Sequence, residues 1–421
     1  MPGCAPYDQL VTSPIAPTRW FRDFGRPPRI LGLDVARALA ILGMAAAHVG
    51  ELRPFAWGDP STWTDLVNGR SSILFALLAG VSIALMTGRS TLPAPERMPT
   101  LRLNLVGRGA AIFLIGLALE MLNTPIAVIL TLYGLLYVAV IPFLRWRAWQ
   151  LLLAAGVLAL VAPAALALLS ALALEPYGAG LGFALYGVYP LTAWLAFVLG
   201  GLALGRLHVE RLRTAVVALA VGVLLAVIGY GLGAVGQAAG VGGDDGGIGS
   251  GDGGFGFGSG WDAYPAALAG LDPLRSVLSA FFGVEPHSGG TAEILGSGGF
   301  ALALVALCLL LSRPLRWVFL PLAALGSMPL TAYTVHVVSI VVLVGPGGFV
   351  QSTAFWLLTA IALVVAATLW SILFGRGPLE RLVGRAAQAM ASVPVDRRGA
   401  SADTERHDPA TPVITGHRLD P

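Results

Sequence analysis

The feature that most constrains the fold is a series of apolar segments, each long enough to cross a membrane. Hydrophobic residues make up 56% of the 421 residues and charged residues only 12%, whereas a soluble domain carries about 25% charged residues. A helix of about 20 apolar residues spans a bilayer core of roughly 30 Å. The sequence therefore predicts an all-α, polytopic transmembrane bundle of about ten spans, at 31–49, 71–87, 104–122, 125–144, 149–173, 190–206, 214–236, 294–312, 317–344 and 354–374.

The distribution of arginine predicts the orientation of the bundle. Most arginines lie in the two tails and in every second connection between spans, while the remaining connections hold only Arg53, Arg70 and Arg275. By the positive-inside rule, both termini are cytoplasmic and the protein lies in the cell membrane. Residues 1–29 contain no apolar stretch typical of a cleaved signal peptide, so the first span serves as the insertion signal. The arginines are scattered, which argues against nucleic-acid binding.

The same pattern divides the chain into five parts. A cytoplasmic tail (1–29) precedes an N-terminal membrane half (30–236), an extracytoplasmic glycine-rich loop (237–293), a C-terminal membrane half (294–385) and a disordered cytoplasmic tail (386–421). Within the loop, the stretch from Trp261 to Phe282 suits a short interfacial helix or a re-entrant segment.

The ninth apolar segment is predicted to contain a break in its helix. Gly326 and Pro329 flank Ser327 and Met328, and both glycine and proline disfavour a continuous helix. We interpret the segment as one kinked or interrupted span. A surface helix followed by a short span is the alternative.

Three ionisable residues share one face of the first span. Asp34, Arg37 and His48 fall on a narrow stripe with Ile41 and Met44 at 100° per residue. An ionisable group near the bilayer centre costs about 2.5–3.5 kcal/mol, so this face is expected to line a protein interior or a cavity. Asp34 and Arg37 also suit a simple i,i+3 ion pair at the end of the helix. His48 lies about 16 Å further along, toward the opposite side of the membrane.

Histidine supplies the candidate chemistry. With the expected topology, His48, His287 and His336 all lie toward the outer face, with Glu293 near His287. Imidazole titrates near neutrality, so it can deprotonate an amine or hydroxyl that attacks a thioester. A helix–helix hydrogen bond is the plainer role for a histidine such as His336. No closely spaced ligand pair supports a zinc site, so no metal is expected, and no Gly-x-Ser-x-Gly elbow supports a serine hydrolase.

Several motifs resemble a known family of membrane acyltransferases. The opening helix, from Leu33 to Met44, and the segment Gly69–Gly80 resemble bacterial proteins with a heparan-α-glucosaminide N-acetyltransferase catalytic domain. Nearer the C-terminus, three motifs resemble a domain of unknown function, DUF418, that occurs in the same class of membrane proteins. They are Pro286–Gly289, Gly326–Tyr333, and Trp370 with Gly377–Arg381.

The resemblance implies a two-sided reaction. Acyl-CoA, as a co-substrate and not a bound cofactor, would enter from the cytoplasm and reach through the bundle toward His48. The acceptor would bind on the extracytoplasmic side. The candidate CoA-binding residues are Arg37, Asp34, Arg108, Arg376 and Arg381, because the planar fork of arginine suits phosphate. In the animal acetyltransferase the catalytic histidine follows the first helix, where this chain has Phe55–Trp63 and no histidine. The assignment to His48 therefore follows the broader acyltransferase pattern.

The predicted function is transfer of an acetyl or similar acyl group from cytoplasmic acyl-CoA to an extracytoplasmic amine or hydroxyl, with a sugar as one candidate acceptor. The alternative is a secondary transporter, in which the break at 326–329 and the buried charges would form a solute site. Such transporters usually carry paired broken helices, and this sequence shows one clear break and no internal repeat. The sequence does not predict the oligomeric state.

Overall fold

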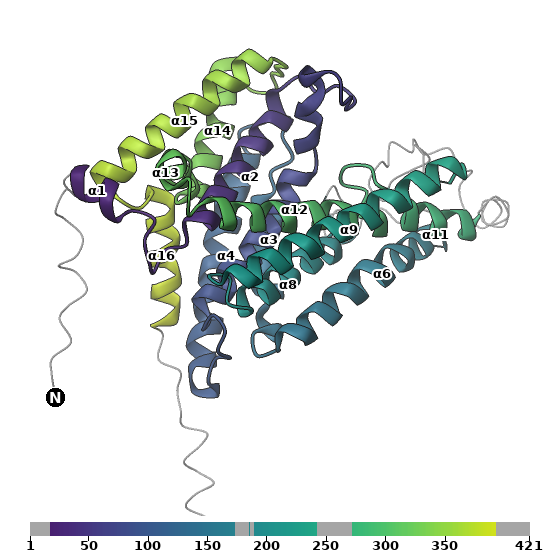
Figure 1. Ribbon diagram of the computed structural model, residues 1–421, viewed down its shortest axis with the longest axis horizontal. Coiled ribbons are helices and arrows are strands. Elements are labelled where there is room, and N and C mark those ends of the chain that lie inside the picture. The colour runs from purple at the N-terminus through teal and green to yellow at the C-terminus, as the bar shows by residue number, and fades with distance from the viewer. Residues whose placement is uncertain (1–16, 173–184, 186–188, 242–271, 393–421) are drawn as a thin grey trace, which may run out of the picture.

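A computed structural model describes residues 17–172, 185, 189–241 and 272–392, and within these ranges the chain forms helices and no strand (Figure 1). The glycine-rich stretch after Val241, up to residue 271, and most of the C-terminal tail lie outside the described residues. The α-helices are α1 (Pro17–Asp23), α2 (Leu31–Val49), α3 (Arg70–Met86), α4 (Met98–Glu120), α5 (Leu130–Ala139), α6 (Ala148–Leu172), α8 (Leu191–Arg206), α9 (Leu212–Ala238), α11 (Pro273–Phe282), α12 (Thr291–Leu311), α13 (Arg316–Gly326), α14 (Pro329–Val344), α15 (Thr353–Phe374) and α16 (Pro378–Ala391), with short 3-10 helices η2 (Pro60–Val67), η3 (Pro95–Arg97) and η4 (Ile141–Phe143).

The all-helical membrane fold is confirmed. Six helices of the described chain are long and apolar enough to cross a membrane, and eight segments qualify if each of two bent helix pairs counts as one span. The two shorter apolar helices are α5 and α8. The count of ten spans and the orientation of the termini remain predictions.

The fourth expected span, 125–144, needs correction. Its helix α5 runs only from Leu130 to Ala139, which at about 1.5 Å per residue covers roughly half of a bilayer core. Pro125 precedes the helix and Pro142 lies in the 3-10 turn that follows it. Proline lacks an N–H donor and opposes continuation of a helix, so the apolar residues at both ends of the predicted span leave the helix.

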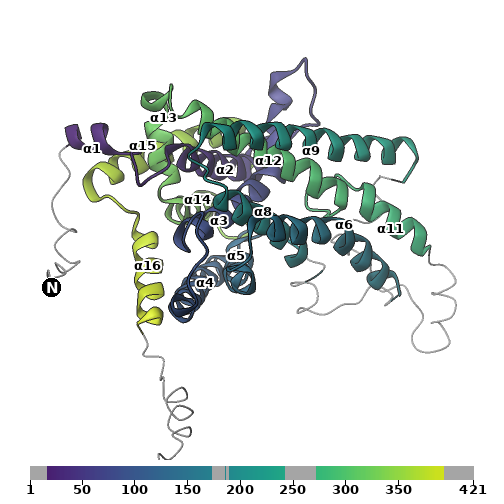
Figure 2. The same cartoon turned by 60° about the horizontal axis from the view of Figure 1, so that its bottom comes forward.

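Helix α2 lies at the centre of the bundle, in contact with α3, α12, α13, α14 and α15 (Figures 1 and 2). Most of its residues are buried, including Asp34. The hydrogen bond from Arg37 to Ser82 joins the start of α2 to the end of α3, whereas His48 and Ser71 line one pocket at the other ends of these helices. The two helices are therefore antiparallel, and the bundle has one end near Asp34 and another near His48.

Arg206 fixes several helix ends at the Asp34 end of the bundle. Its side chain is buried at the end of α8, and its Nη1 donates to the carbonyl oxygens of Arg89 and Thr91 at 2.9 and 3.1 Å. Its Nη2 donates to the carbonyl of Leu144, at 2.8 Å. A buried arginine requires such acceptors because unpaired burial of its charge is costly. The connections after α3 and α5 therefore meet the end of α8 at one place.

The ninth segment is an interrupted helix, as predicted. Helices α13 and α14 meet at an angle of 69° across the break at Ser327 and Met328. Gly326 permits the close contact of α13 with α2, since a Cβ at this position would lie 1.7 Å from the carbonyl oxygen of Asp34. Glu380 of α16 then accepts hydrogen bonds from the backbone N–H groups of Leu330 and Thr331, at 2.8 and 3.1 Å. A carboxylate on the first free N–H groups stabilises the start of α14.

Both segments expected as tails contribute helices that pack on the bundle. In α1, Trp20 is buried and its Nε1 donates to Ser371 of α15 at 2.9 Å. At the other end, α16 continues beyond Arg385 to Ala391 and packs against α4, where Gly107 faces Ala387. The disordered tail expected from residue 386 therefore needs correction, because the apolar face of α16 is buried. Within the predicted interfacial segment, α11 packs against α6, α9 and α12.

Candidate active site

A cavity of about 250 Å³ lies at the His48 end of the bundle, and we call it the histidine pocket. Its walls come from the end of α2, from η2 and the start of α3, from the loop between α4 and α5, and from the segments that precede α8 and α12. Helix α14 and the loop after it complete the walls. The lining residues are Met44, Ala47, His48, Val67, Asn68, Gly69, Ser71, Ser72, Pro125, Ile126, Ala127, Ile129, Tyr189, His287, Tyr333 and Phe349. Segments distant in the sequence thus meet where two of the three predicted histidines lie.

His48 and His336 form a direct pair. Nδ1 of His48 lies 3.3 Å from Nε2 of His336, and the two rings are stacked with an angle of 11° between their planes. One nitrogen must donate and the other accept, so the contact fixes the tautomers of the two rings relative to each other. His336 is buried, while His48 lines the pocket. The helix–helix hydrogen bond considered for His336 is therefore present, and its partner is His48.

His287 faces the same pocket from the loop before α12. Its backbone lies in the left-handed region, with φ at 68°, and Glu293 holds the loop by accepting from the N–H groups of His287 and Gly289 at 2.7 Å each. The imidazole stacks on Trp194, with ring centroids 6.1 Å apart. Burial lowers the pKa of His287 to about 4, because burial disfavours the charged ring. The ring is therefore neutral at pH 7, and its buried Nδ1 has no hydrogen-bond partner among the described residues.

Several polar residues of the pocket were not assigned a role from the sequence. The hydroxyl of Tyr189 donates to the carbonyl of Ala127 at 3.2 Å, and burial raises the pKa of Tyr189 to about 12, so the phenol stays protonated. Asn68 and Ser71 also line the cavity. Ser71 belongs to a motif recognised in the sequence, whereas Tyr189 lies just before α8 and carries no local signal of a site.

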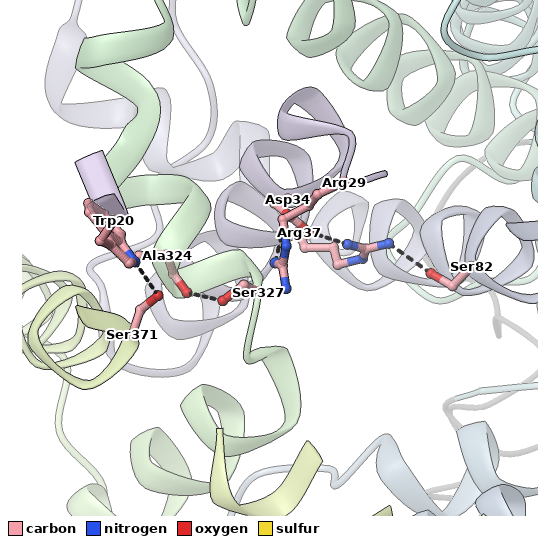
Figure 3. A network of polar contacts seen from close by, with 8 residues as sticks. All are labelled: Trp20, Arg29, Asp34, Arg37, Ser82, Ala324, Ser327 and Ser371. Carbon is pink, nitrogen blue, oxygen red and sulfur yellow. Dashed lines mark hydrogen bonds and ion pairs between the residues drawn. The ribbon is translucent and has the colours of Figure 1, made fainter. Parts of the chain in front are cut away.

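At the opposite end of α2, Asp34 lies between two arginines (Figure 3). It pairs with Arg29 at 3.0 Å and with Arg37 at 2.5 Å, and Arg37 also donates to Ser82 at 2.9 Å. Two cations therefore compensate a buried carboxylate, and the Ser82 hydroxyl accepts from the second of them, Arg37. The i,i+3 ion pair expected between Asp34 and Arg37 is present, and the structure separates it from the histidine pocket along α2.

The other predicted CoA-binding arginines lie apart from the histidine pocket. Arg381 packs over the ring of Trp370, with 5.9 Å from its guanidinium carbon to the ring centroid, and the carbonyl of Arg376 accepts from the Nε1 of the same tryptophan at 3.2 Å. The Nε of Arg108 in α4 is buried without a partner among the described residues. The structure therefore does not bring Arg37, Arg108, Arg376 and Arg381 together around the histidine pocket.

The arrangement favours acid–base chemistry. A histidine pair beside a cavity can accept a proton from a bound amine or hydroxyl, and the pocket offers further hydroxyl and amide groups to orient that molecule. As for the zinc alternative, the described part of the chain contains no group of three histidine, cysteine or acidic side chains suited to a metal ion.

Taken together, the fold and the pocket define a polytopic membrane protein with a buried histidine site. Residues 29–230 match the family described as heparan-alpha-glucosaminide N-acetyltransferase, catalytic, and residues 278–389 match a family described as a protein of unknown function, DUF418. The N-terminal half of the chain is thus similar to the catalytic domain of a membrane acetyltransferase family, and a region similar to DUF418 follows it. No curated protein and no solved structure matches the chain.

Proposed function

We propose that the protein transfers an acetyl or similar acyl group from acyl-CoA to an extracytoplasmic amine or hydroxyl, with a sugar as one candidate acceptor. The observation that carries the proposal is the His48–His336 pair at a cavity, in a chain whose N-terminal half matches an acetyltransferase catalytic domain. The cavity lies at the end of the bundle predicted to face outward, where the acceptor would bind.

The histidine pair supports a role for each ring. If Nδ1–H of His48 donates to Nε2 of His336, the lone pair of His48 Nε2 is left for the pocket that His48 lines. His48 then acts as the base and His336 as a positioning residue. The acceptor loses its proton to His48 as it attacks the thioester carbonyl. The tetrahedral intermediate collapses with cleavage of the C–S bond, and the imidazolium returns the proton to the departing thiolate.

His287 is the third histidine of the proposal. It lines the same cavity as His48, and Glu293 holds its loop rigidly. Because its ring is neutral and its Nδ1 lacks a partner in the described chain, it is suited to a hydrogen bond with the acceptor or with the acyl carbonyl. Such a bond would orient the reacting groups.

The donor would approach from the end of α2 that holds Arg37. Arg37 retains only some of its N–H groups for a phosphate, since others already donate to Asp34 and Ser82. Arg108, Arg376 and Arg381 remain candidates for the CoA phosphates, with Asp34 keeping Arg37 in position. Acyl-CoA is a co-substrate in this scheme, and we expect no resident cofactor.

The interrupted helix, which motivated the transporter alternative, serves a structural role here. In transporters of this type, the free N-terminus of a half-helix commonly faces an anionic substrate. In this chain, Glu380 occupies the N-terminal N–H groups of α14, so the site is already filled by a carboxylate of the protein. This contact favours the enzyme over the transporter.

The proposal is tested with purified protein in sealed vesicles, with acyl-labelled acetyl-CoA on the side of the termini and a panel of amines and amino sugars inside. We expect label to appear on an enclosed acceptor, with one free CoA thiol released for each acyl group transferred. Uptake of an unmodified solute without acyl transfer would instead favour the transporter. Calorimetry with acetyl-CoA on the same protein checks that the donor binds.

A further inference from the structure

A second cavity, of about 270 Å³, lies at the Asp34 end of the bundle. The start of α2 contributes Leu31 to this cavity, whereas His48, near the other end of α2, lines the histidine pocket. We call it the arginine pocket, because five arginines line it: Arg26, Arg29, Arg211, Arg313 and Arg316. They come from the segment before α2, the start of α9, and the connection between α12 and α13, so the fold gathers positive charge from three separate segments.

The positive charge of the pocket is largely uncompensated. The single acidic residue of its wall, Glu210, pairs with Arg89 outside the pocket, and among the five arginines only Arg29 pairs with a carboxylate of the described chain, that of Asp34. Arg26 and Arg211 are exposed, and their side chains have no hydrogen-bond partner among the described residues. Charged groups concentrated in this way attract an anion.

Backbone contacts hold the remaining two arginines in place. The Nη2 of Arg316 donates to the carbonyl oxygens of Phe21, Arg22 and Phe24, at 3.0, 2.9 and 2.9 Å. The Nη2 of Arg313 donates to the carbonyl of Glu210. Carbonyl oxygens fix the guanidinium groups without neutralising them, so the wall of the pocket is ordered and remains positively charged.

The rest of the pocket is apolar and continues onto an exposed apolar surface. Leu31, Leu212 and Leu309 line the cavity. Beside it, Val216 of α9 and Val318 of α13 are 51% and 68% exposed, on helices that face the bilayer in a membrane protein. A ligand that fits this surface carries an anionic group for the arginines and an apolar portion that extends along α9 and α13.

We propose that the arginine pocket binds the phosphate headgroup of an anionic phospholipid, whose acyl chains lie on the exposed side chains of α9 and α13. Basic pockets between membrane helices on the cytoplasmic side bind phosphate headgroups in this way, and this end of the bundle is the one predicted to be cytoplasmic. The phosphates of CoA have the same chemistry. The lipid is favoured because apolar residues line the cavity beside the arginines and because the neighbouring side chains of α9 and α13 are exposed.

The test uses full-length, delipidated protein in detergent and a fluorescent phosphatidylglycerol as the probe. Arg26→Gln/Arg211→Gln removes the two unpartnered, exposed arginines, and Arg145→Gln/Arg147→Gln removes the same charge from an exposed connection outside the pocket. Each arginine near a membrane surface contributes about 1 kcal/mol to anionic lipid binding, so the pocket variant should bind the probe about tenfold or more weakly. The control variant should bind it as the parent does, and Arg26→Lys/Arg211→Lys should retain most of the affinity.

Competition distinguishes the two sources of phosphate. Unlabelled phosphatidylglycerol should displace the probe, whereas phosphatidylcholine and CoA should not. Equal loss of binding in the pocket variant and the control variant would overturn the proposal, because it would indicate a general charge effect. Displacement by CoA at concentrations similar to those of phosphatidylglycerol would also overturn it, because the site would then serve the acyl donor. Neither outcome bears on whether His48 is the catalytic base.

Discussion

The His48–His336 contact joins residues that are 288 positions apart in the sequence. The expected topology placed both rings in the same leaflet, but helix periodicity carries no information on which helix packs against which. The contact changes the interpretation of His336 from a second candidate base to the partner that sets the tautomer of His48. The interpretation of Arg37 changes in a similar way. Its ion pair with Asp34 and its hydrogen bond to Ser82 give it a structural role, in addition to any contact with CoA.

At the residue scale, His287 should make the protein sensitive to acid. Its pKa is about 4 in the folded protein and near 6.5 when the chain is unfolded, so the unfolded state binds more protons between these values. Stability is therefore full above about pH 6.5 and falls as the pH is lowered toward 4, by at most roughly 3 kcal/mol. Thermal unfolding of His287→Gln and of the parent between pH 4 and pH 8 measures how much of this pH dependence of stability comes from His287. If the pH dependence of both proteins is the same, His287 is not buried as described.

At the scale of elements, the sequence predicted which segments form helices better than it predicted the lengths and partners of those helices. The break after Gly326 follows from glycine and proline chemistry, and the structure contains it. The short helix α5 was missed because hydropathy does not register the two prolines beside it. Helix α16 was missed because only one of its faces is apolar, which a search for continuous apolar spans does not detect. That face packs against α4. The histidine pocket, built from loops and helix ends, depends on such tertiary contacts.

The contact between α13 and α2 gives a prediction for one glycine. Gly326→Ala places a Cβ 1.7 Å from the carbonyl of Asp34, against rigid backbone, so α13 must move away from α2. We expect a loss of several kcal/mol in stability, in the range of overpacked or displaced core contacts. Gly384→Ala in α16 is the matched control, because no atom lies within 4 Å of its new Cβ. It should be neutral or stabilise by up to about 1 kcal/mol. The measurement is the midpoint temperature of thermal unfolding of both variants in detergent. Equal midpoints for the two variants would contradict the close packing of α13 on α2.

At the scale of the whole molecule, the bundle has two chemically different ends. The Asp34 end holds the arginine pocket and the buried Arg206. The His48 end holds the histidine pocket, and there the N–H of Ser352, just before α15, donates to the carbonyl of Val49 at 2.7 Å. The charge distribution, the direction of the helices and the chemistry of the two pockets thus all define the same axis, which runs from the Asp34 end of the bundle to the His48 end. Only the assignment of that axis to the two sides of a membrane rests on the positive-inside rule.

The axis predicts the result of cysteine labelling in intact cells. With Cys4 and Cys308 replaced by serine, single cysteines at Asp59 and Gly348 should react with an impermeant thiol reagent from outside, and cysteines at Pro95 and Arg147 should not. Asp59 and Gly348 lie in connections at the His48 end, and Pro95 and Arg147 lie in connections at the other end. Labelling of Gly348 only after the membrane is opened would show that the α13–α14 pair does not carry the chain across.

The most direct test of the proposed chemistry is single-turnover acyl transfer by His48→Gln. Glutamine retains hydrogen bonding to His336 but lacks a base, so transfer should slow by about 10²–10⁴-fold while binding of acetyl-CoA is largely kept. His208→Gln, which removes an exposed histidine outside both pockets, should transfer at the parental rate. If folded His48→Gln transfers acyl groups at close to the parental rate, His48 is not the base, and the pair it forms with His336 only packs α2 against α14.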